Sequence, residues 1–326
     1  MAKKEKFDFQ KDILDKYKAN ANIQMTSTGS INLDILLGGG INKGSMYVFW
    51  GEQGCGKSTC ASQIVRSFCR EGKKVLFIDS EKALNGMQCD SFELTPFIND
   101  GRLSLLTIDN FIELSEIIKA SNDASFDYDL VVIDSMTSIN TFEDVENFDI
   151  LDNKPAQHAS QSQKVLNLMR TIFTRKGVSS IIICHARANI SMVATPYSPT
   201  TKLAGGFALR HIPDVLVHVS SSTKLKRTDG SVYGQCVKVV AEKNKFAIPF
   251  NTREVKLVFG KGISRKEEVI NFAIEFGLIT TSGGGNYTLP DGTTVRGIDN
   301  IMSKVDETML KALHDQVVEH LNAQKV

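Results

Sequence analysis

One octapeptide has the residue types and spacing of a loop that binds the phosphate chain of a nucleotide. It reads Gly51-Glu52-Gln53-Gly54-Cys55-Gly56-Lys57-Ser58 and fills every fixed position of the pattern GxxxxGK[ST]. In such a loop, successive backbone N–H groups turn toward the phosphates. Lys57 would reach the β- and γ-phosphates, and the Ser58 hydroxyl would bind a magnesium ion. The sequence thus predicts a nucleotide site formed by this octapeptide and Thr59.

The segments on either side of the loop fit the same interpretation. Residues 46–50 form a short β-prone apolar run before it. After it, Ala61, Ile64, Val65 and Phe68 follow the spacing of one helix face. The positive end of that helix would lie behind the phosphates. Strand, loop and helix together favour a phosphate site over an ordinary glycine turn.

Three carboxylates that follow apolar runs are candidates for holding metal or activating water. Asp134 ends the run 130–134 and would hold Mg²⁺ near Ser58; the alternative is that it only caps the following turn. Asp79 and Glu81 follow another run, whose carboxyl end would border the crevice in which open α/β sheets bind ligands. Of these two we choose Glu81 to orient the attacking water, because it lies beyond the strand, although local reasoning hardly separates it from Asp79.

Continuous apolar runs alternate with helical patterns through the central part of the chain. The runs lie at 75–79, 130–134 and 180–184, and the helical patterns at about 111–121 and 157–175. Runs without polar alternation are typical of strands covered on both faces. The fold class is therefore α/β, with a mostly parallel central sheet. Three later runs, at 215–219, 236–240 and 255–259, alternate more clearly and predict an antiparallel extension of that sheet.

The two ends of the chain differ from this central part. Residues 7–20 carry a weakly amphipathic helical pattern, which predicts a helix folded back on its own domain or an arm that docks on a neighbouring subunit. After about residue 264, two helical patterns and glycine-rich turns predict a separate small α+β unit. We therefore divide the chain into an N-terminal arm (1–25), a core (26–264) and a C-terminal domain (265–326).

The bulk composition is that of an ordinary soluble protein. The 326 residues carry a net charge of +1 and are 42% hydrophobic, so any contact with nucleic acid must come from a local patch. No signal peptide or membrane-spanning stretch is evident, which favours a cytoplasmic protein without membrane partners. The six cysteines form no CxxC pair and are expected to be reduced thiols.

A long polar segment between two apolar runs has the composition of a phosphate-binding loop. Residues 186–206 show almost no regular pattern, and long structureless stretches between strands are usually functional or mobile. The candidate phosphate-binding residues are Arg187, Asn189, Lys202, Gly205, Gly206 and, just beyond the segment, Arg210. Basic side chains and exposed backbone suit binding along phosphates; the alternative is a merely solvated loop.

Three further residues are ambiguous by local reasoning. Lys243 and Lys245 lie two apart at a strand end, so both side chains point to one face, where they are either solvated or bound to phosphate. His185 directly follows an apolar run. It is either a core histidine or a hydrogen-bonding sensor of the nucleotide state.

Together, these segments resemble the RecA recombinases. The resemblance rests on the phosphate loop and on residues 27–34, 77–84, 205–210 and 243–250, which stand in the order and at about the separations of that family. It extends over essentially the whole chain, including Gly285-Asn286-Tyr287 in the C-terminal unit. His185 stands where bacterial RecA has glutamine and resembles the phage recombinase UvsX, which suggests a phage-encoded relative.

The resemblance implies an ATP-dependent recombinase that forms a helical filament on single-stranded DNA and exchanges strands with a homologous duplex. ATP and Mg²⁺ would bind between subunits, and the partners would include further copies of the chain and, in bacterial or phage-infected cells, single-strand-binding and loading proteins. Glu81 matches the catalytic glutamate, Asp134 the magnesium-associated acid and His185 the γ-phosphate sensor. Lys243 and Lys245 match the pair that reaches the neighbouring subunit's ATP. Residues 187–206 resemble the second DNA-binding loop, and residues 143–157 occupy the place of the first.

The chain also departs from the family pattern at the expected adenine pocket. Asn85 and Gln88 stand where bacterial RecA has an aspartate and a tyrosine, which leaves nucleotide preference open and makes Phe259 an alternative stacking residue. Two other functions fit the same core: a ring-forming helicase or motor, and a non-catalytic recombination mediator. The Gly205-Gly206 loop, the lysine pair and the C-terminal unit argue against the first, and an intact Lys57, Ser58, Glu81 and Asp134 argue against the second.

Overall fold

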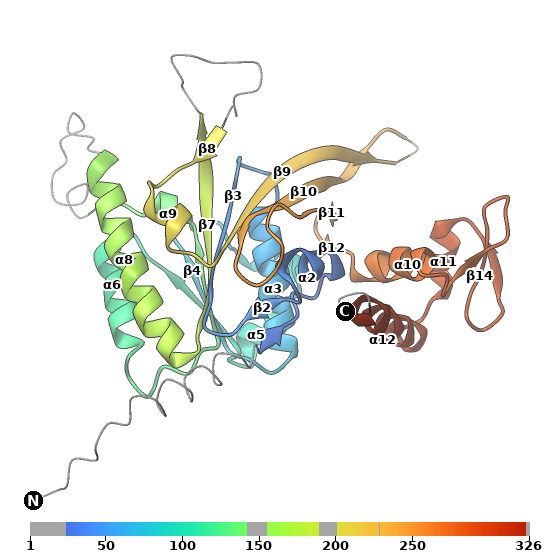
Figure 1. Ribbon diagram of the computed structural model, residues 1–326, viewed down its shortest axis with the longest axis horizontal. Coiled ribbons are helices and arrows are strands. Elements are labelled where there is room, and N and C mark those ends of the chain that lie inside the picture. The colour runs from blue at the N-terminus through green and yellow to red at the C-terminus, as the bar shows by residue number, and fades with distance from the viewer. Residues whose placement is uncertain (1–23, 142–154, 189–200, 228, 324–326) are drawn as a thin grey trace, which may run out of the picture.

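A ten-stranded sheet runs through the larger part of the molecule (Figure 1). The computed structural model describes residues 24–141, 155–188, 201–227 and 229–323. The strand order is β12-β11-β10-β9-β3-β7-β6-β4-β5, with β8 paired to β7. The bounds are β3 Met46–Gly51, β4 Val75–Asp79, β5 Leu103–Thr107, β6 Leu130–Asp134, β7 Ser179–Ala188, β8 Thr201–Leu203, β9 Val215–Lys226, β10 Val232–Asn244, β11 Thr252–Val258 and β12 Gly262–Ile263. The predicted α/β class with a mostly parallel central sheet is confirmed.

The later strands differ in one respect from the prediction. The run 215–219 was expected in an antiparallel extension, but β9 is parallel to β3, with Tyr47 opposite Val215 and Trp50 opposite His218. Antiparallel pairing begins only with β10. Beyond the end of β3, β9 and β10 continue side by side, and β11 stays paired to β10 as far as Gly234 (Figure 1). An apolar run in the sequence does not show whether the neighbouring strand is parallel or antiparallel to it, because this depends on the order of the strands in the sheet.

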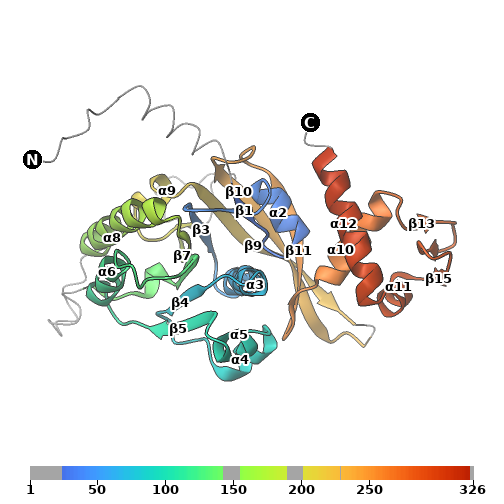
Figure 2. The ribbon, with the colours of Figure 1, turned by 90° about the horizontal axis from the view of Figure 1, so that it is seen from below.

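Helices cover both faces of the sheet because successive residues of each strand point to opposite sides. Phe49 belongs to the apolar cluster under α2 (Ile31–Leu37) and α3 (Lys57–Arg70), whereas Val48 belongs to the cluster under α6 (Phe111–Ala120), α8 (Pro155–Lys176) and α9 (Ala208–His211). The remaining helices of the core are α4 Gly86–Ser91 and α5 Thr95–Asn99. Figure 2 shows α6 and α8 on one side of the sheet and α3 on the other. The short elements β1 (Met25–Thr26), β2 (Ile41–Asn42) and η1 (Met136–Ser138) complete the core.

Segment 186–206, predicted to lack regular structure, contains strand at both ends. Strand β7 continues to Ala188 and pairs antiparallel with β8, which sets Arg187 opposite Lys202. Residues 189–200 lie outside the described residues, as do residues 143–154 of the predicted first DNA loop (143–157) and the predicted arm helix at 7–20. Alternating polar residues in strand ends give little apolar signal, which is why the sequence pattern missed these strands.

The C-terminal residues form a second, smaller unit beside the core (Figure 1). It contains α10 Arg265–Glu275, a three-stranded sheet of β13 Thr280–Thr281, β14 Asn286–Thr288 and β15 Thr294–Arg296, then α11 Ile298–Lys304 and α12 Glu307–Ala323. Buried Glu268 of α10 joins the two units, because its carboxylate accepts hydrogen bonds from Ser30 Oγ (2.9 Å), the Ile31 amide (2.9 Å) and Asn32 Nδ2 (3.0 Å). Among the described residues, no helix is long and apolar enough to cross a membrane.

Candidate nucleotide and DNA sites

The phosphate loop connects the carboxyl end of β3 to the first turn of α3. Two of its glycines are required by the geometry. Gly56 has φ of 97°, a left-handed conformation that favours glycine. At Gly51, an added Cβ would lie 2.0 Å from the Val219 carbonyl oxygen of β9. The fixed glycines of the motif therefore let the loop turn tightly against the neighbouring strand.

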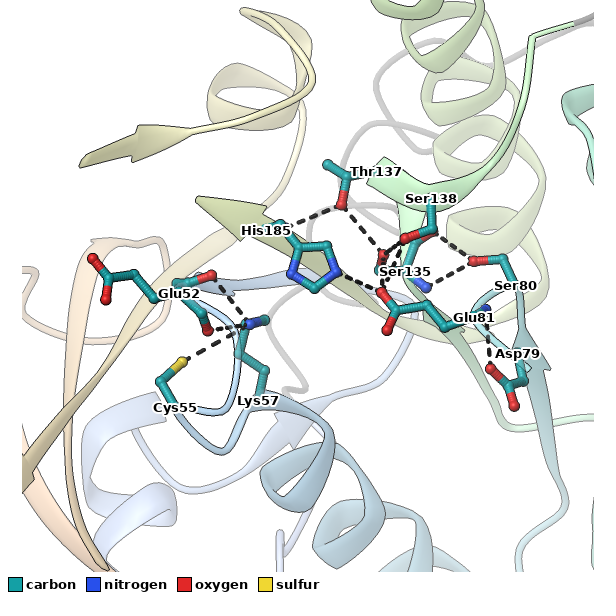
Figure 3. A network of polar contacts seen from close by, with 11 residues as sticks. Glu52, Cys55, Lys57, Asp79, Ser80, Glu81, Ser135, Thr137, Ser138 and His185 are labelled. Carbon is teal, nitrogen blue, oxygen red and sulfur yellow. Dashed lines mark hydrogen bonds and ion pairs between the residues drawn. The ribbon is translucent and has the colours of Figure 1, made fainter. Parts of the chain in front are cut away.

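Lys57 is held over this loop by the loop's own backbone. Its Nζ donates hydrogen bonds to the carbonyl oxygens of Glu52 (2.7 Å) and Gly51 (3.1 Å), and the residue is only 4% exposed (Figure 3). The ammonium group is thus already positioned at the end of the loop. A triphosphate bound there would bring oxygen acceptors to a group whose rotamer is largely fixed.

Ser58 and Asp134 come together beside Lys57 although they are far apart in the sequence. Asp134 ends β6, and its carboxylate accepts a hydrogen bond from the Ser58 side chain. Burial raises the pKa of Asp134 to about 6, and the nearby carboxylates of Glu81 and Asp79 act in the same direction. The hydroxyl and the carboxylate are oxygen ligands of the kind Mg²⁺ prefers, and Mg²⁺ is commonly held by one or two carboxylates together with substrate phosphates. The Ser58 hydroxyl and the Asp134 carboxylate therefore fit the Mg²⁺ ion that the sequence predicts.

Glu81 lies just beyond β4 and is the centre of a hydrogen-bond network (Figure 3). Its Oε1 lies 2.5 Å from His185 Nε2, which must be the donor because a carboxylate only accepts. Ser135 Oγ at 2.6 Å and Ser138 Oγ at 3.0 Å donate to the same atom. The hydrogen bond from His185, followed by those from Ser135 and Ser138, lowers the pKa of Glu81 to about 2 against the opposing effect of burial. The carboxylate is therefore ionised and fixed in orientation.

Asp79, the alternative to Glu81, has a different place. Its two carboxylate oxygens accept hydrogen bonds from the backbone amides of Glu81 (3.1 Å) and Leu84 (2.8 Å), and the residue is 5% exposed. Asp79 thus shapes the loop that carries Glu81. The serines of the network were not predicted from sequence; their only signal is that Ser135 and Ser138 follow the apolar run of β6.

A cavity of about 300 Å³ is lined by six of the nine predicted nucleotide residues, whereas Gly51, Glu52 and Cys55 are not part of its lining. Its lining residues are Gln53, Gly54, Gly56, Lys57, Ser58, Thr59, Glu81, Phe92, His185, Gln235, Leu257, Val258, Phe259 and Gly260. Gln235 Nε2 donates to the Gly54 carbonyl oxygen (3.0 Å), a contact from β10 that the sequence did not reveal. Phe259 lies at the wall, where the sequence placed an alternative stacking residue, whereas Asn85 caps α4 by accepting from the Gln88 amide.

A second cavity, of about 750 Å³, gathers the predicted DNA residues. Arg187, Lys202, Gly205, Gly206 and Arg210 all line it. Asn189, the sixth candidate, lies outside the described residues. Trp50 and Glu242 form part of the same lining, and the Trp50 indole N–H donates to the Glu242 carboxylate (3.1 Å). The structure thus brings five of the sequence candidates to one basic hollow.

Lys243 and Lys245 lie toward the opposite end of the sheet from the phosphate loop. Asn244, between them, pairs with Val215, which pairs with Tyr47 near the start of β3. Lys243 Nζ donates to the carbonyl oxygen of His211 in α9 (2.8 Å), and Lys245 Nζ lies 2.8 Å from the Asp214 carboxylate. The lysines therefore do not face the nucleotide cavity of their own subunit.

Comparison with known proteins places this geometry in a family. The family model described as the RecA N-terminal domain matches residues 3–264. The chain belongs to the RecA family. It is a RecA-type recombinase, and proteins of this family are DNA-dependent ATPases.

Individual RecA relatives match over most of their length. RecA of Deinococcus radiodurans is 27% identical over 94% of this chain and 82% of its own length, and RecA of Campylobacter fetus is 28% identical over 92% and 84%. The chromosomal RecA of Lactococcus lactis is 31% identical over 81% of this chain and 67% of its own. The crystal structure of the RadB recombinase superposes with a TM-score of 0.52 at 23% identity, covering 73% of this chain and 98% of RadB, and so supports the fold.

Proposed function

We propose that this RecA-family protein binds ATP and Mg²⁺ at the cavity around Lys57 and hydrolyses ATP only when assembled on single-stranded DNA. The assembly is a helical filament that pairs its strand with a homologous duplex and exchanges strands. The observation that carries this proposal is the place of Lys243 and Lys245, which lie away from their own phosphate loop and would complete the site of a neighbouring subunit.

Five side chains in or beside the nucleotide cavity have roles in this chemistry. Lys57 binds the β- and γ-phosphates, and Ser58 and Asp134 hold the magnesium ion. When bound there, the ion would neutralise charge that builds up on the phosphate oxygens. Glu81 accepts a hydrogen bond from the attacking water and orients it in line with the γ-phosphate, while the donors on its Oε1 prevent rotation of the carboxylate. His185 of β7 contacts Glu81 directly, so a shift of Glu81 when the γ-phosphate is lost would also move His185 and the end of β7.

Positive charge from the adjacent subunit would complete the site. Lys243 and Lys245 would stabilise the charge of the transferring phosphoryl group, as arginine fingers do in related reactions. Residues 1–25 would contribute to the same assembly by docking on a neighbour, and residues 265–326 would form a separate accessory domain. Because one site needs two subunits, hydrolysis would depend on assembly.

The basic cavity would bind the phosphates of the single strand. Arg187, Lys202 and Arg210 supply charge, and Gly205 and Gly206 allow close approach of backbone N–H groups. Contacts of this kind carry no base information, so binding should tolerate any sequence and weaken steeply with salt.

ATPase activity with and without single-stranded DNA tests the proposal, together with electron microscopy of the complexes. We expect DNA-stimulated hydrolysis, its loss in Lys57→Ala, and helical filaments. Closed rings would instead favour a motor built on the same core. Absence of hydrolysis at saturating DNA would favour a non-catalytic mediator.

A further inference from the structure

An exposed aromatic pair lies at the basic cavity and has no role in the function proposed so far. Phe207, directly before α9, is 76% exposed. Its ring stacks on His211, with ring centroids 3.6 Å apart and an angle of 27° between the planes. Both residues line the cavity that contains Arg187, Lys202 and Arg210. The pair therefore presents a flat aromatic face beside a cluster of cations.

The charged residues around Phe207 favour a nucleotide over an apolar protein partner as the ligand of this surface. An apolar protein partner would have to bury the neighbouring cations, and burial of unpaired charge is costly. A nucleotide of a single strand has the complementary composition, since its phosphate is anionic and its base is a flat apolar ring. Base stacking on aromatic side chains combined with basic grooves is the common way in which single strands are held without sequence preference.

The backbone under the pair is also fixed. The backbone amides of Arg210 (3.1 Å) and His211 (3.3 Å) both donate to the Phe207 carbonyl oxygen, which closes the turn that carries the pair. His211 in turn covers one face of the Phe207 ring. A base that stacks on Phe207 would therefore meet a preorganised surface and would not have to order it.

We propose that Phe207, backed by His211, is a stacking platform for one unpaired base of the single strand whose phosphates bind Arg187, Lys202 and Arg210. The inference rests on the proposed function and adds to it a contact with a base. Every base has a π-face, so the contact strengthens binding without selecting a sequence.

The test measures the affinity of the protein for a fluorescent oligonucleotide over a series of salt concentrations. Phe207→Ala and Phe207→Leu should lower the affinity by about five- to one-hundred-fold, whereas Phe207→Trp should retain it, because only the aromatic variants keep a stacking face. The slope of log affinity against log salt should stay unchanged in all three variants. In Arg210→Ala the slope should become shallower by about 0.7, since one phosphate contact is lost. Ile298→Ala, at an exposed apolar residue of the C-terminal unit, is the matched control and should bind as the unaltered protein does.

An abasic oligonucleotide of equal length separates stacking from other causes. The unaltered protein and Phe207→Ala should bind it with equal affinity, because it offers no base. The proposal is overturned if Phe207→Leu binds the normal strand as tightly as the unaltered protein, or if the defect persists on the abasic strand. It is also overturned if Phe207→Ala only weakens self-association without DNA, which would make the ring a contact between copies. If neither the unaltered protein nor Arg210→Ala shows salt-dependent binding, the proposed function itself fails.

Discussion

The division of one catalytic site between two subunits can be tested by mixing two inactive variants. Asn244 pairs with Val215, which pairs with Tyr47, so Asn244 lies at the height of Tyr47 in the sheet. Tyr47 and Gly51 are four positions apart on β3, which corresponds to about 13 Å along the strand. Strand β10 lies two strands away from β3, which adds about 10 Å across the sheet. An extended lysine side chain spans roughly 6 Å. Lys245, one residue farther along, cannot reach the phosphate loop of its own subunit.

The perturbation is a pair of substitutions, Lys57→Ala and Lys245→Ala. Each should abolish DNA-stimulated ATP hydrolysis when it is present in every subunit. In an equimolar mixture, a site is intact when its phosphate loop comes from the Lys245→Ala chain and its trans lysine from the Lys57→Ala chain. Random assembly through head-to-tail interfaces makes about a quarter of the sites intact, so about a quarter of the normal rate should return.

The assay is steady-state ATP hydrolysis on saturating single-stranded DNA at several mixing ratios. The recovered rate should be greatest at the equimolar ratio and should fall to zero at either end. Lys238→Ala removes an exposed lysine of β10, the strand that ends one residue before Lys245, and is the matched control; a normal rate is expected when this variant is alone. A mixture that stays inactive at every ratio, although both variants enter the filaments, would refute the shared site.

Three further results follow from single side chains. Glu81→Gln should still bind ATP but should hydrolyse it about one-hundred- to ten-thousand-fold more slowly, which is the usual contribution of a positioned base. A normal hydrolysis rate would show that Glu81 takes no part in the reaction. Burial raises the pKa of Asp134 to about 6, so the carboxyl gains a proton as the pH falls through this value. Magnesium affinity in the presence of ATP should then weaken by about tenfold for each pH unit below that point, a dependence that Asp134→Asn should lack in parallel titrations. In Glu268→Gln, the new amide N–H would face groups that are themselves donors, so the free energy of unfolding measured in urea should fall by about 1–3 kcal/mol. An unchanged unfolding midpoint would contradict the role of Glu268 at the junction with Ser30.

Much of the nucleotide site could be predicted from the sequence because its parts are local. The octapeptide fixes the relative positions of Lys57 and Ser58, and covalent geometry joins it to one strand and one helix. Asp134 and Glu81 were accessible for a related reason, since each follows a buried apolar run and the carboxyl ends of parallel strands meet at one edge of a sheet.

Strand order and register decided what local patterns could not. The hydrogen bonds from Ser135 and His185 to Glu81 connect β7 to the residues that follow β4 and β6, and the sequence separations of 54 and 104 residues carry no sign of them. The parallel direction of β9 and the place of Lys245 at the far end of the sheet likewise depend on which strands become neighbours. The phosphate loop and its flanking strand and helix can thus be recognised in the amino-acid sequence alone, because local backbone geometry and periodicity are enough. The shared contacts of distant side chains with one Glu81 oxygen, and the position of Lys243 and Lys245 away from their own nucleotide cavity, follow from long-range strand pairing and are visible only in the folded chain.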